Sequence, residues 1–205
     1  IKSVANGEAD IGDASREVKP SEKQQYSNVN FVDHKVALDG VAVIVSKDIY
    51  NSGVTDLTLE QIKEIYNGTI SNWNKVGGPN KEIFINEREE GSGTRDTFME
   101  FVDLEETKAD KSSSSNSAVK QAVKGSDKAI GYVGFGYADS STPAVAINGV
   151  EPTSENIKSE DYPISRSLHM YTKGEPKGAV KEFIDFVLSE EGQQIVEQED
   201  FISIS

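Results

Sequence analysis

The chain has 205 residues, which is enough for one domain or two small ones. It carries 21 Lys and Arg residues against 35 Asp and Glu residues, and the net charge of −14 disfavours binding to nucleic acid phosphates or to anionic lipid surfaces. Only 36% of the residues are hydrophobic, but they fall in periodic blocks that can bury a core. Cysteine is absent, which excludes disulfides, thiolate metal sites and a cysteine nucleophile. No apolar run is long enough to predict a membrane span.

The first seven residues have the pattern of the end of a helix. Ile1, Val4 and Ala5 lie at helical spacing, and Gly7 is typical of a residue at which a helix stops. We interpret this stretch as the tail of a helix whose start precedes Ile1. The alternative is a frayed terminus that was trimmed during processing.

The rest of the chain alternates between predicted strands and predicted helices. Runs of apolar residues predict strands at 9–12, 29–32, 36–45, 83–85, 129–133, 144–147 and 168–172. Helical spacing and capping residues predict helices after Ser15 as far as Tyr26, at 58–68, around 98–102, at 118–123 behind the polar run 112–117, at 180–187, and after Ser189. This alternation predicts an α/β fold.

One segment, residues 88–98, combines several features that bind anions. It follows a predicted strand and leads into a predicted helix, whose first amides lack partners and lie at the positive end of the helix dipole. Gly91 and Gly93 allow the backbone to approach a ligand, while Ser92 and Thr94 supply hydroxyl groups. Arg88 adds a planar, charged set of donors. We interpret the segment as an oxyanion site; the alternative is an ordinary helix cap.

A second turn from strand to helix, at residues 12–16, carries a hydroxyl group on Ser15 and a guanidinium group on Arg16. By itself this signal is weak, because capping explains Ser15 and surface exposure explains Arg16. His34 and His169 have no neighbours at the spacing of metal ligands, and we interpret both as structural residues. No metal, cofactor or catalytic residue is predicted.

The order of these motifs resembles that of the extracytoplasmic phosphate-binding proteins of ABC-type phosphate importers. The resemblance extends over essentially the whole chain, and the segments that carry it are 6–16, 39–45, 57–68, 70–73, 88–94, 129–133 and 162–166. It implies a two-lobed α/β fold of the periplasmic-binding-protein-like type II class, with a hinge that closes over one phosphate ion. The implied lobes are residues 1–37 with 167–205 (lobe I, incomplete) and residues 38–166 (lobe II).

The resemblance also implies ligands for phosphate. Arg88, Ser92, Gly93 and Thr94 match the family's ligand motif, and Ser15 falls in its other ligand loop. The best-known form of the family has at the Ser15 position an aspartate that accepts the proton of bound phosphate. In this chain the residue that accepts the phosphate proton is not assigned.

Four further residues are weaker candidates for the site. Asp39, Asp13 and Glu90 are candidates for the proton acceptor, and Arg16 is a further candidate ligand.

Four other residues are expected to have structural roles. Arg166 and Asp161 are interpreted as members of ion pairs at the hinge, and Trp73 and Tyr162 as packing residues.

The implied function is high-affinity binding of inorganic phosphate outside the cell and delivery to the membrane permease of an ABC importer. The alternatives are a binding protein for sulfate or molybdate and, with less support, an enzyme acting on phosphate esters. The family carries two further anion-contacting loops before the position of Ile1. We therefore expect the 205-residue chain to recruit that missing N-terminal segment or a second chain, and expect the segment to hold a membrane anchor.

Overall fold

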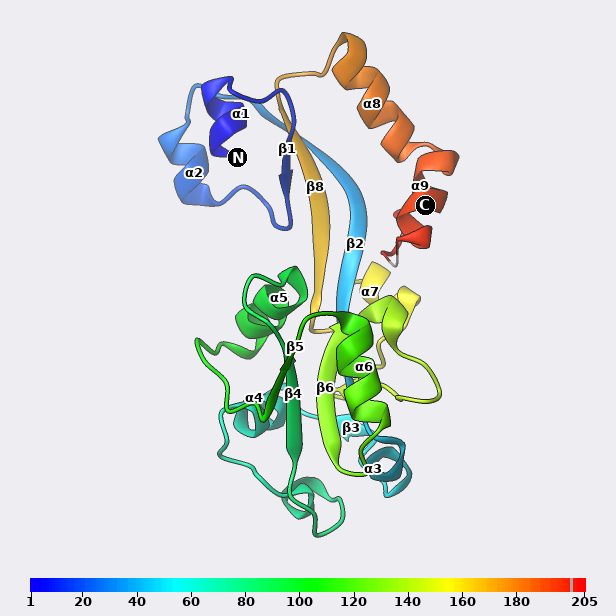
Figure 1. Ribbon diagram of the computed structural model, residues 1–205. Coiled ribbons are helices and arrows are strands. Elements are labelled where there is room, and N and C mark those ends of the chain that lie inside the picture. Colours follow the sequence, from blue (N-terminus) through cyan, green and yellow to red (C-terminus); the bar gives the residue numbers. More distant parts are fainter. Residues whose placement is uncertain (200) are drawn as a thin grey trace. The chain divides into compact units, whose positions relative to one another are not determined.

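The chain folds into two compact units in a computed structural model that describes residues 1–199 and 201–205 (Figure 1). Unit 1 comprises Ile1–Asp39 with Arg166–Ser205, and unit 2 comprises Gly40–Ser165. The chain passes between the units twice, within β2 (Phe31–Val45) and at the start of β8 (Ser165–Lys173). The sequence predicts two functional lobes with boundaries of their own, 1–37 with 167–205 and 38–166. These functional lobes remain a proposal.

Unit 2 contains most of the regular structure. Its strands, besides the second half of β2, are β3 (Asp56–Leu57), β4 (Phe84–Arg88), β5 (Lys111–Ser113), β6 (Ala129–Gly134) and β7 (Ala146–Ile147). Its helices are α3 (Lys47–Asn51), α4 (Leu59–Tyr66), α5 (Gly93–Val102), α6 (Asn116–Lys124) and α7 (Ser154–Lys158), with short 3-10 turns η1 (Trp73–Val76) and η2 (Phe135–Tyr137).

The sheet of unit 2 has the strand order β2, β6, β4, β5 (Figure 1). β2 runs antiparallel to β6, with Val41 opposite Gly134, whereas β6, β4 and β5 run parallel to one another. Residues 41–45 of β2 are all fully buried. This confirms the prediction, made from their uninterrupted apolar run, of a strand covered on both faces.

A cluster of three aromatic rings fills the core of unit 2 between α4, α5 and β6. Phe98 stacks on Tyr132 with ring centroids 3.9 Å apart, and Tyr66 contacts both rings at 4.6 and 5.7 Å. All three side chains are fully buried. On the other side, α6 lies directly on β6, because a Cβ atom at Gly131 would come within 2.7 Å of Val119. Core packing therefore fixes where α5 and α6 begin.

Unit 1 contains β1 (Gly12–Ala14), β8 and the first half of β2, with β8 between the other two. Its helices are α1 (Lys2–Asn6), α2 (Pro20–Gln25), α8 (Gly178–Leu188) and α9 (Glu190–Gln198). The large hydrophobic side chains that are exposed in the described residues all belong to the C-terminal stretch: Phe183, Phe186, Leu188, Ile195, Phe201 and Ile204. We call these six residues the C-terminal apolar surface.

Several local predictions are confirmed. Gly7 ends α1 in the left-handed conformation, with φ 73°. Thr58 and Gln61 form the predicted capping box of α4, and Ser189 caps α9. Trp73 and Tyr162 are fully buried packing residues.

Two predictions for the first 26 residues are wrong. The strand expected at 9–12 forms instead at Gly12–Ala14. Ser15 does not cap a helix: α2 begins at Pro20, behind Lys19, because proline fixes its φ at a helical value and needs no acceptor for an amide.

The strands expected at 29–32 and 36–45 are one continuous strand, β2. The polar residues between them find partners on β8: Asp33 lies 2.7 Å from His169, and His34 lies 3.2 Å from Thr172. These contacts also give both histidines structural roles.

Two further expectations need correction. The helix predicted at 118–123 begins earlier, at Asn116, and the first part of the polar run 112–117 extends strand β5. Arg166 belongs to an ion pair, as expected, with Asp39 at 3.1 Å from Nε and 3.0 Å from Nη2. Asp161, by contrast, accepts a hydrogen bond from Ser159. No described helix has the length and apolar character needed to cross a membrane.

Because Phe98 is the central ring of the cluster, we expect Phe98→Ala to lower the free energy of unfolding by about 3–5 kcal/mol. Glu100→Ala is the matched control, since Glu100 is exposed on the same helix, and it should change stability by less than about 0.5 kcal/mol. Urea denaturation followed by tryptophan fluorescence measures both. Equal losses in the two variants would contradict this view of the core.

Candidate anion-binding site

The predicted anion-binding segment lies at the carboxyl edge of the parallel strands in unit 2. β4 ends at Arg88, β5 ends at Ser113 directly opposite it, and β6 ends at Gly134. The chain then enters α5 from β4 and α6 from β5. Two helix N-termini thus follow strands that end at the same edge, which is where α/β folds bind ligands.

The start of α5 supplies donors for an anion. Gly91 adopts φ 82°, a left-handed conformation that favours glycine, and turns the chain into the helix. The Ser92 hydroxyl accepts a hydrogen bond from the Arg95 amide at 3.4 Å, and the first intrahelical bond runs from the Asp96 amide to the Ser92 carbonyl. The amides of residues 93 and 94 therefore precede all intrahelical acceptors. Because the cap uses Ser92 as an acceptor, its hydroxyl hydrogen can still be donated.

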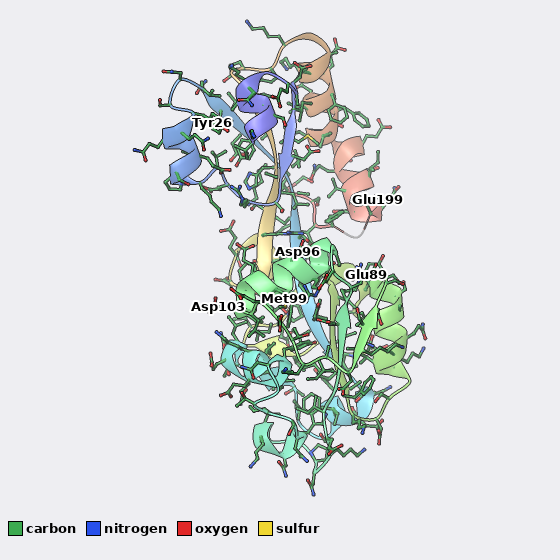
Figure 2. The ribbon with its side chains drawn as sticks, turned by 60° about the vertical axis from the view of Figure 1, so that its left-hand side comes forward. Tyr26, Glu89, Asp96, Met99, Asp103 and Glu199 are labelled. Atoms are coloured by element: carbon green, nitrogen blue, oxygen red, sulfur yellow. The ribbon has the colours of Figure 1, made fainter. Side chains whose placement is uncertain are left out.

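The α5 helix is held in place by its apolar face. Asp96, Met99 and Asp103 lie along it in Figure 2. Met99 is buried, whereas Asp96 and Asp103 are exposed. Anchoring through residues such as Met99 fixes the direction in which the first amides point.

Arg88 differs from the other three arginines of the chain. The others each pair with a carboxylate: Arg16 with Glu22, Arg95 with Glu87, and Arg166 with Asp39. Among the described residues Arg88 has no such partner. Its Nη1 donates to the side-chain oxygen of Asn116 at 2.7 Å, and its Nε is buried without a hydrogen bond there.

The aromatic core holds the backbone of Arg88. Its amide donates to the hydroxyl oxygen of Tyr132 at 3.2 Å. Burial raises the pKa of Tyr132 well above its ordinary value, even though the hydrogen bond from Arg88 acts in the opposite direction. Tyr132 is therefore a neutral acceptor at physiological pH and links the ring cluster to the start of the site.

Sequence reasoning missed three polar residues at this edge. Ser113 donates to the Asn86 side-chain oxygen at 3.0 Å, while the Asn86 side-chain nitrogen is fully buried and has no partner in the described structure. Asn116 was included only in a polar loop. The sequence held one signal for these residues: the polar run 112–117 leads into the start of a helix that lies beside parallel strands.

The structure brings some predicted site residues together and separates others. Arg88, Glu90, Ser92, Gly93 and Thr94 lie in one strand–turn–helix segment of unit 2, with Glu90 exposed. The remaining candidates, Asp13, Ser15, Arg16 and Asp39, belong to unit 1.

The unit 1 candidates have different surroundings. Asp13 and Ser15 are exposed on and after β1. Arg16 donates to both carboxylate oxygens of Glu22 at 2.8 and 3.0 Å, and this hydrogen bonding lowers the pKa of Glu22 to about 2. The roles of these residues toward a ligand remain proposals.

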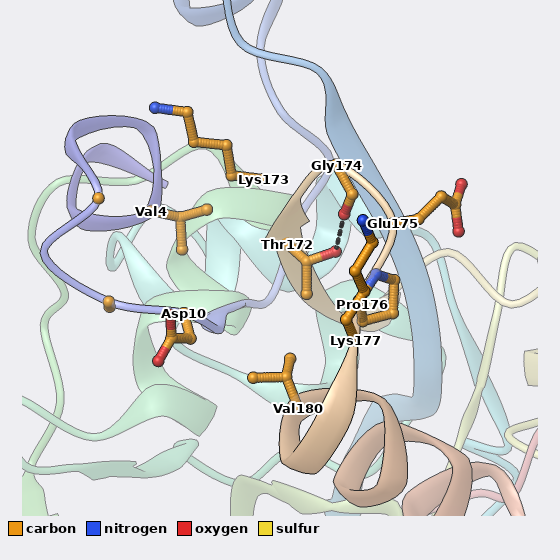
Figure 3. Close-up of a pocket in the computed structure, with 11 residues that line it drawn as sticks. Val4, Asp10, Thr172, Lys173, Gly174, Glu175, Pro176, Lys177 and Val180 are labelled. Atoms are coloured by element: carbon orange, nitrogen blue, oxygen red, sulfur yellow. Dashed lines mark hydrogen bonds between the residues drawn. The ribbon is translucent and has the colours of Figure 1, made fainter.

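A separate pocket of about 310 Å³ lies within unit 1, between the end of α1 and the turn that precedes α8 (Figure 3). Lys173, Lys177, Asp10 and Glu175 are among its lining residues, which therefore include residues of both charges. None of the predicted ligands is among its lining residues, and we do not assign the anion to it. The described residues also contain no cluster of three or more His, Asp or Glu side chains suited to a metal ion.

Known proteins share this architecture. Residues 1–191 match the PBP superfamily domain. The phosphate-binding protein PstS of Bacillus subtilis is 35% identical over 208 aligned residues, which cover 100% of this chain and 68% of that protein. Across relatives of the same name, the chain spans between 61% and 68% of their length.

The similar solved structures indicate the same family as the sequence relatives. A Clostridium perfringens substrate-binding protein with bound phosphate is 41% identical, with a TM-score of 0.74 over 100% of this chain and 83% of that one. An ABC-type phosphate transport receptor from Vibrio cholerae is 31% identical, with a TM-score of 0.84 over 98% and 82%. The predicted fold class, a two-lobed α/β binding protein, is confirmed. The chain belongs to the PBP superfamily and, within it, to the family of the phosphate-binding proteins named PstS.

Since the hydroxyl group of Tyr132 accepts a hydrogen bond from the partly buried amide of Arg88, we expect Tyr132→Phe to lower the free energy of unfolding by about 1–3 kcal/mol, the cost of leaving this donor unpaired. Tyr66→Phe is the control: this equally buried hydroxyl donates to the Asn86 carbonyl over a long 3.5 Å, and its loss should cost less. Thermal and urea unfolding of both variants provide the comparison. A larger loss for Tyr66→Phe would show that the Arg88 amide does not depend on Tyr132.

Proposed function

We propose that this protein binds inorganic phosphate outside the cell and delivers it to the membrane permease of an ABC importer. The ligands in unit 2 are Arg88, Ser92, Gly93 and Thr94, and Ser15 contributes from unit 1. The names of the relatives, and the phosphate bound in the Clostridium perfringens structure, support this ligand. The protein works by binding and release, without catalysis.

The observation that carries the proposal is the state of Arg88. In a chain with 35 acidic residues, its guanidinium group pairs with a neutral amide rather than a carboxylate in the described structure. Its Nε is buried with no hydrogen bond. A buried donor without a partner costs free energy unless a ligand completes it. A tetrahedral oxyanion beside the α5 N-terminus supplies the missing acceptors.

The net charge of −14 is compatible with an anionic ligand. Amides, hydroxyl groups and helix ends act at contact distance, whereas surface charges are screened beyond about 8–10 Å at physiological salt. The site therefore depends on its local dipoles and on one guanidinium group.

Selectivity for phosphate rests on a carboxylate that accepts the proton of the bound ion. Sulfate has no such proton and would place a lone pair against the carboxylate. Asp39, Asp13 and Glu90 are the candidates, and Arg16 is a further candidate ligand. Asp39 already holds Arg166 at 3.0 Å, and Glu90 is the candidate in the same segment as Arg88.

Two alternatives are distinguishable. A binding protein for sulfate or molybdate would use the same donors without a proton acceptor. An enzyme acting on phosphate esters would need an activated nucleophile or a metal, and a phosphatase assay with added divalent metals tests it.

Isothermal titration calorimetry with phosphate and with sulfate tests the function. We expect phosphate to bind and sulfate to be rejected, because only phosphate donates a hydrogen bond to the acceptor carboxylate. Arg88→Ala should weaken phosphate binding by about 1.5–3 kcal/mol, roughly tenfold to a hundredfold, without loss of folding. Equal affinity for sulfate would favour the first alternative, and an absence of phosphate binding would refute the proposal.

The partners and location are part of the same proposal. A further polypeptide, either another segment of the same protein or a second chain, covers the C-terminal apolar surface. Phe183 at 49% and Phe186 at 43% exposure support this, since exposed apolar side chains on neighbouring turns mark interaction surfaces.

We accordingly expect the isolated 205-residue chain to associate or to bind phosphate weakly. Analytical ultracentrifugation with intact mass and phosphate titration measures both. Phe183→Ser with Phe186→Ser should shift an associated chain toward monomer, while Lys181→Ser on the same helix serves as control. A monomer of 22.3 kDa that binds phosphate tightly would contradict the expectation.

A further inference from the structure

The side chain of Arg88 is oriented by a residue that lies 28 positions later in the chain. Arg88 Nη1 donates to the Asn116 side-chain oxygen at 2.7 Å. The bond fixes rotation of the planar guanidinium group, since one of its nitrogens is tied. The Nε atom of Arg88 is buried and makes no hydrogen bond to a described residue.

Asn116 itself is held firmly. It is the first residue of α6, directly after the cap Ser115, whose hydroxyl accepts from the Ala118 amide at 3.1 Å. α6 is seated on β6 by close packing of Val119 at Gly131. A Cβ atom at Gly134 would stand 3.3 Å from the Asn116 side-chain nitrogen, so glycine leaves the amide just enough room.

We infer that Asn116 is a positioning residue for anion binding, which holds the Arg88 guanidinium group in one orientation and leaves its charge available to the ligand. This inference rests on the proposed function and extends it. An amide oxygen orients the guanidinium group without cancelling its charge, whereas a carboxylate would compete with the incoming anion. The other three arginines, each paired with a carboxylate, lack that availability.

A double-mutant cycle read by calorimetry with inorganic phosphate tests the inference. Asn116→Ala should weaken phosphate binding about tenfold, and it should have no further effect in the Arg88→Ala background, because it acts only through Arg88. Ser115→Ala is the matched control: it removes the cap of the same helix and should lower thermal stability while leaving the affinity within about twofold. Unchanged affinity in Asn116→Ala, the same loss in Ser115→Ala, or additive losses in the double variant would each overturn the inference.

A second readout separates this inference from the function on which it rests. Nitrogen-15 spectra of the ligand-free protein report the arginine side chains, and Arg88→Ala assigns the Arg88 Nε–H signal by its disappearance. In Asn116→Ala the Arg88 guanidinium hydrogens should average through faster rotation, while Ser115→Ala leaves them unchanged. If the parent protein binds no phosphate, the proposed function fails and these spectra alone decide the role of Asn116; unaltered Arg88 signals in Asn116→Ala refute it.

Discussion

The central constraint on this protein is that one positive side chain must stay available in a chain with a net charge of −14. An arginine in such surroundings ordinarily finds a carboxylate, as Arg16, Arg95 and Arg166 do. Arg88, at the end of β4, instead donates a hydrogen bond to the amide oxygen of Asn116. Much of the surrounding structure maintains this arrangement.

The aromatic cluster and the sheet register hold the residues around Arg88 in place. Tyr132 holds the Arg88 amide, and Phe98 stacks on the same ring from the helix that carries the neighbouring donors. The core therefore sets both the strand end and the helix start that make up the proposed site. Because protein interiors are close-packed, small changes in these rings should be felt at the guanidinium group.

Unit 1 is held together by a different kind of contact. Its β2 and β8 strands are linked through buried or half-buried polar contacts, including Asp33 with His169, rather than through apolar packing alone. Its C-terminal helices present large apolar side chains to solvent. Unit 2 thus has a well-covered aromatic core, whereas unit 1 leaves apolar surface uncovered, which fits a surface that receives further polypeptide.

The sequence by itself determined the α/β class, the caps at Thr58 and Ser189 and the buried run of β2, and it supplied the proposal that residues 88–94 bind an anion. These follow from local chemistry: periodicity, capping groups and glycine positions lie within a few residues of one another. It misplaced β1 and α2, and it split β2, since cross-strand partners such as Thr172 cannot be read from neighbouring residues. Only the tertiary structure decided that Asn116 meets Arg88 and that Asp39 meets Arg166, because strand pairing and helix packing bring together residues that are distant in sequence.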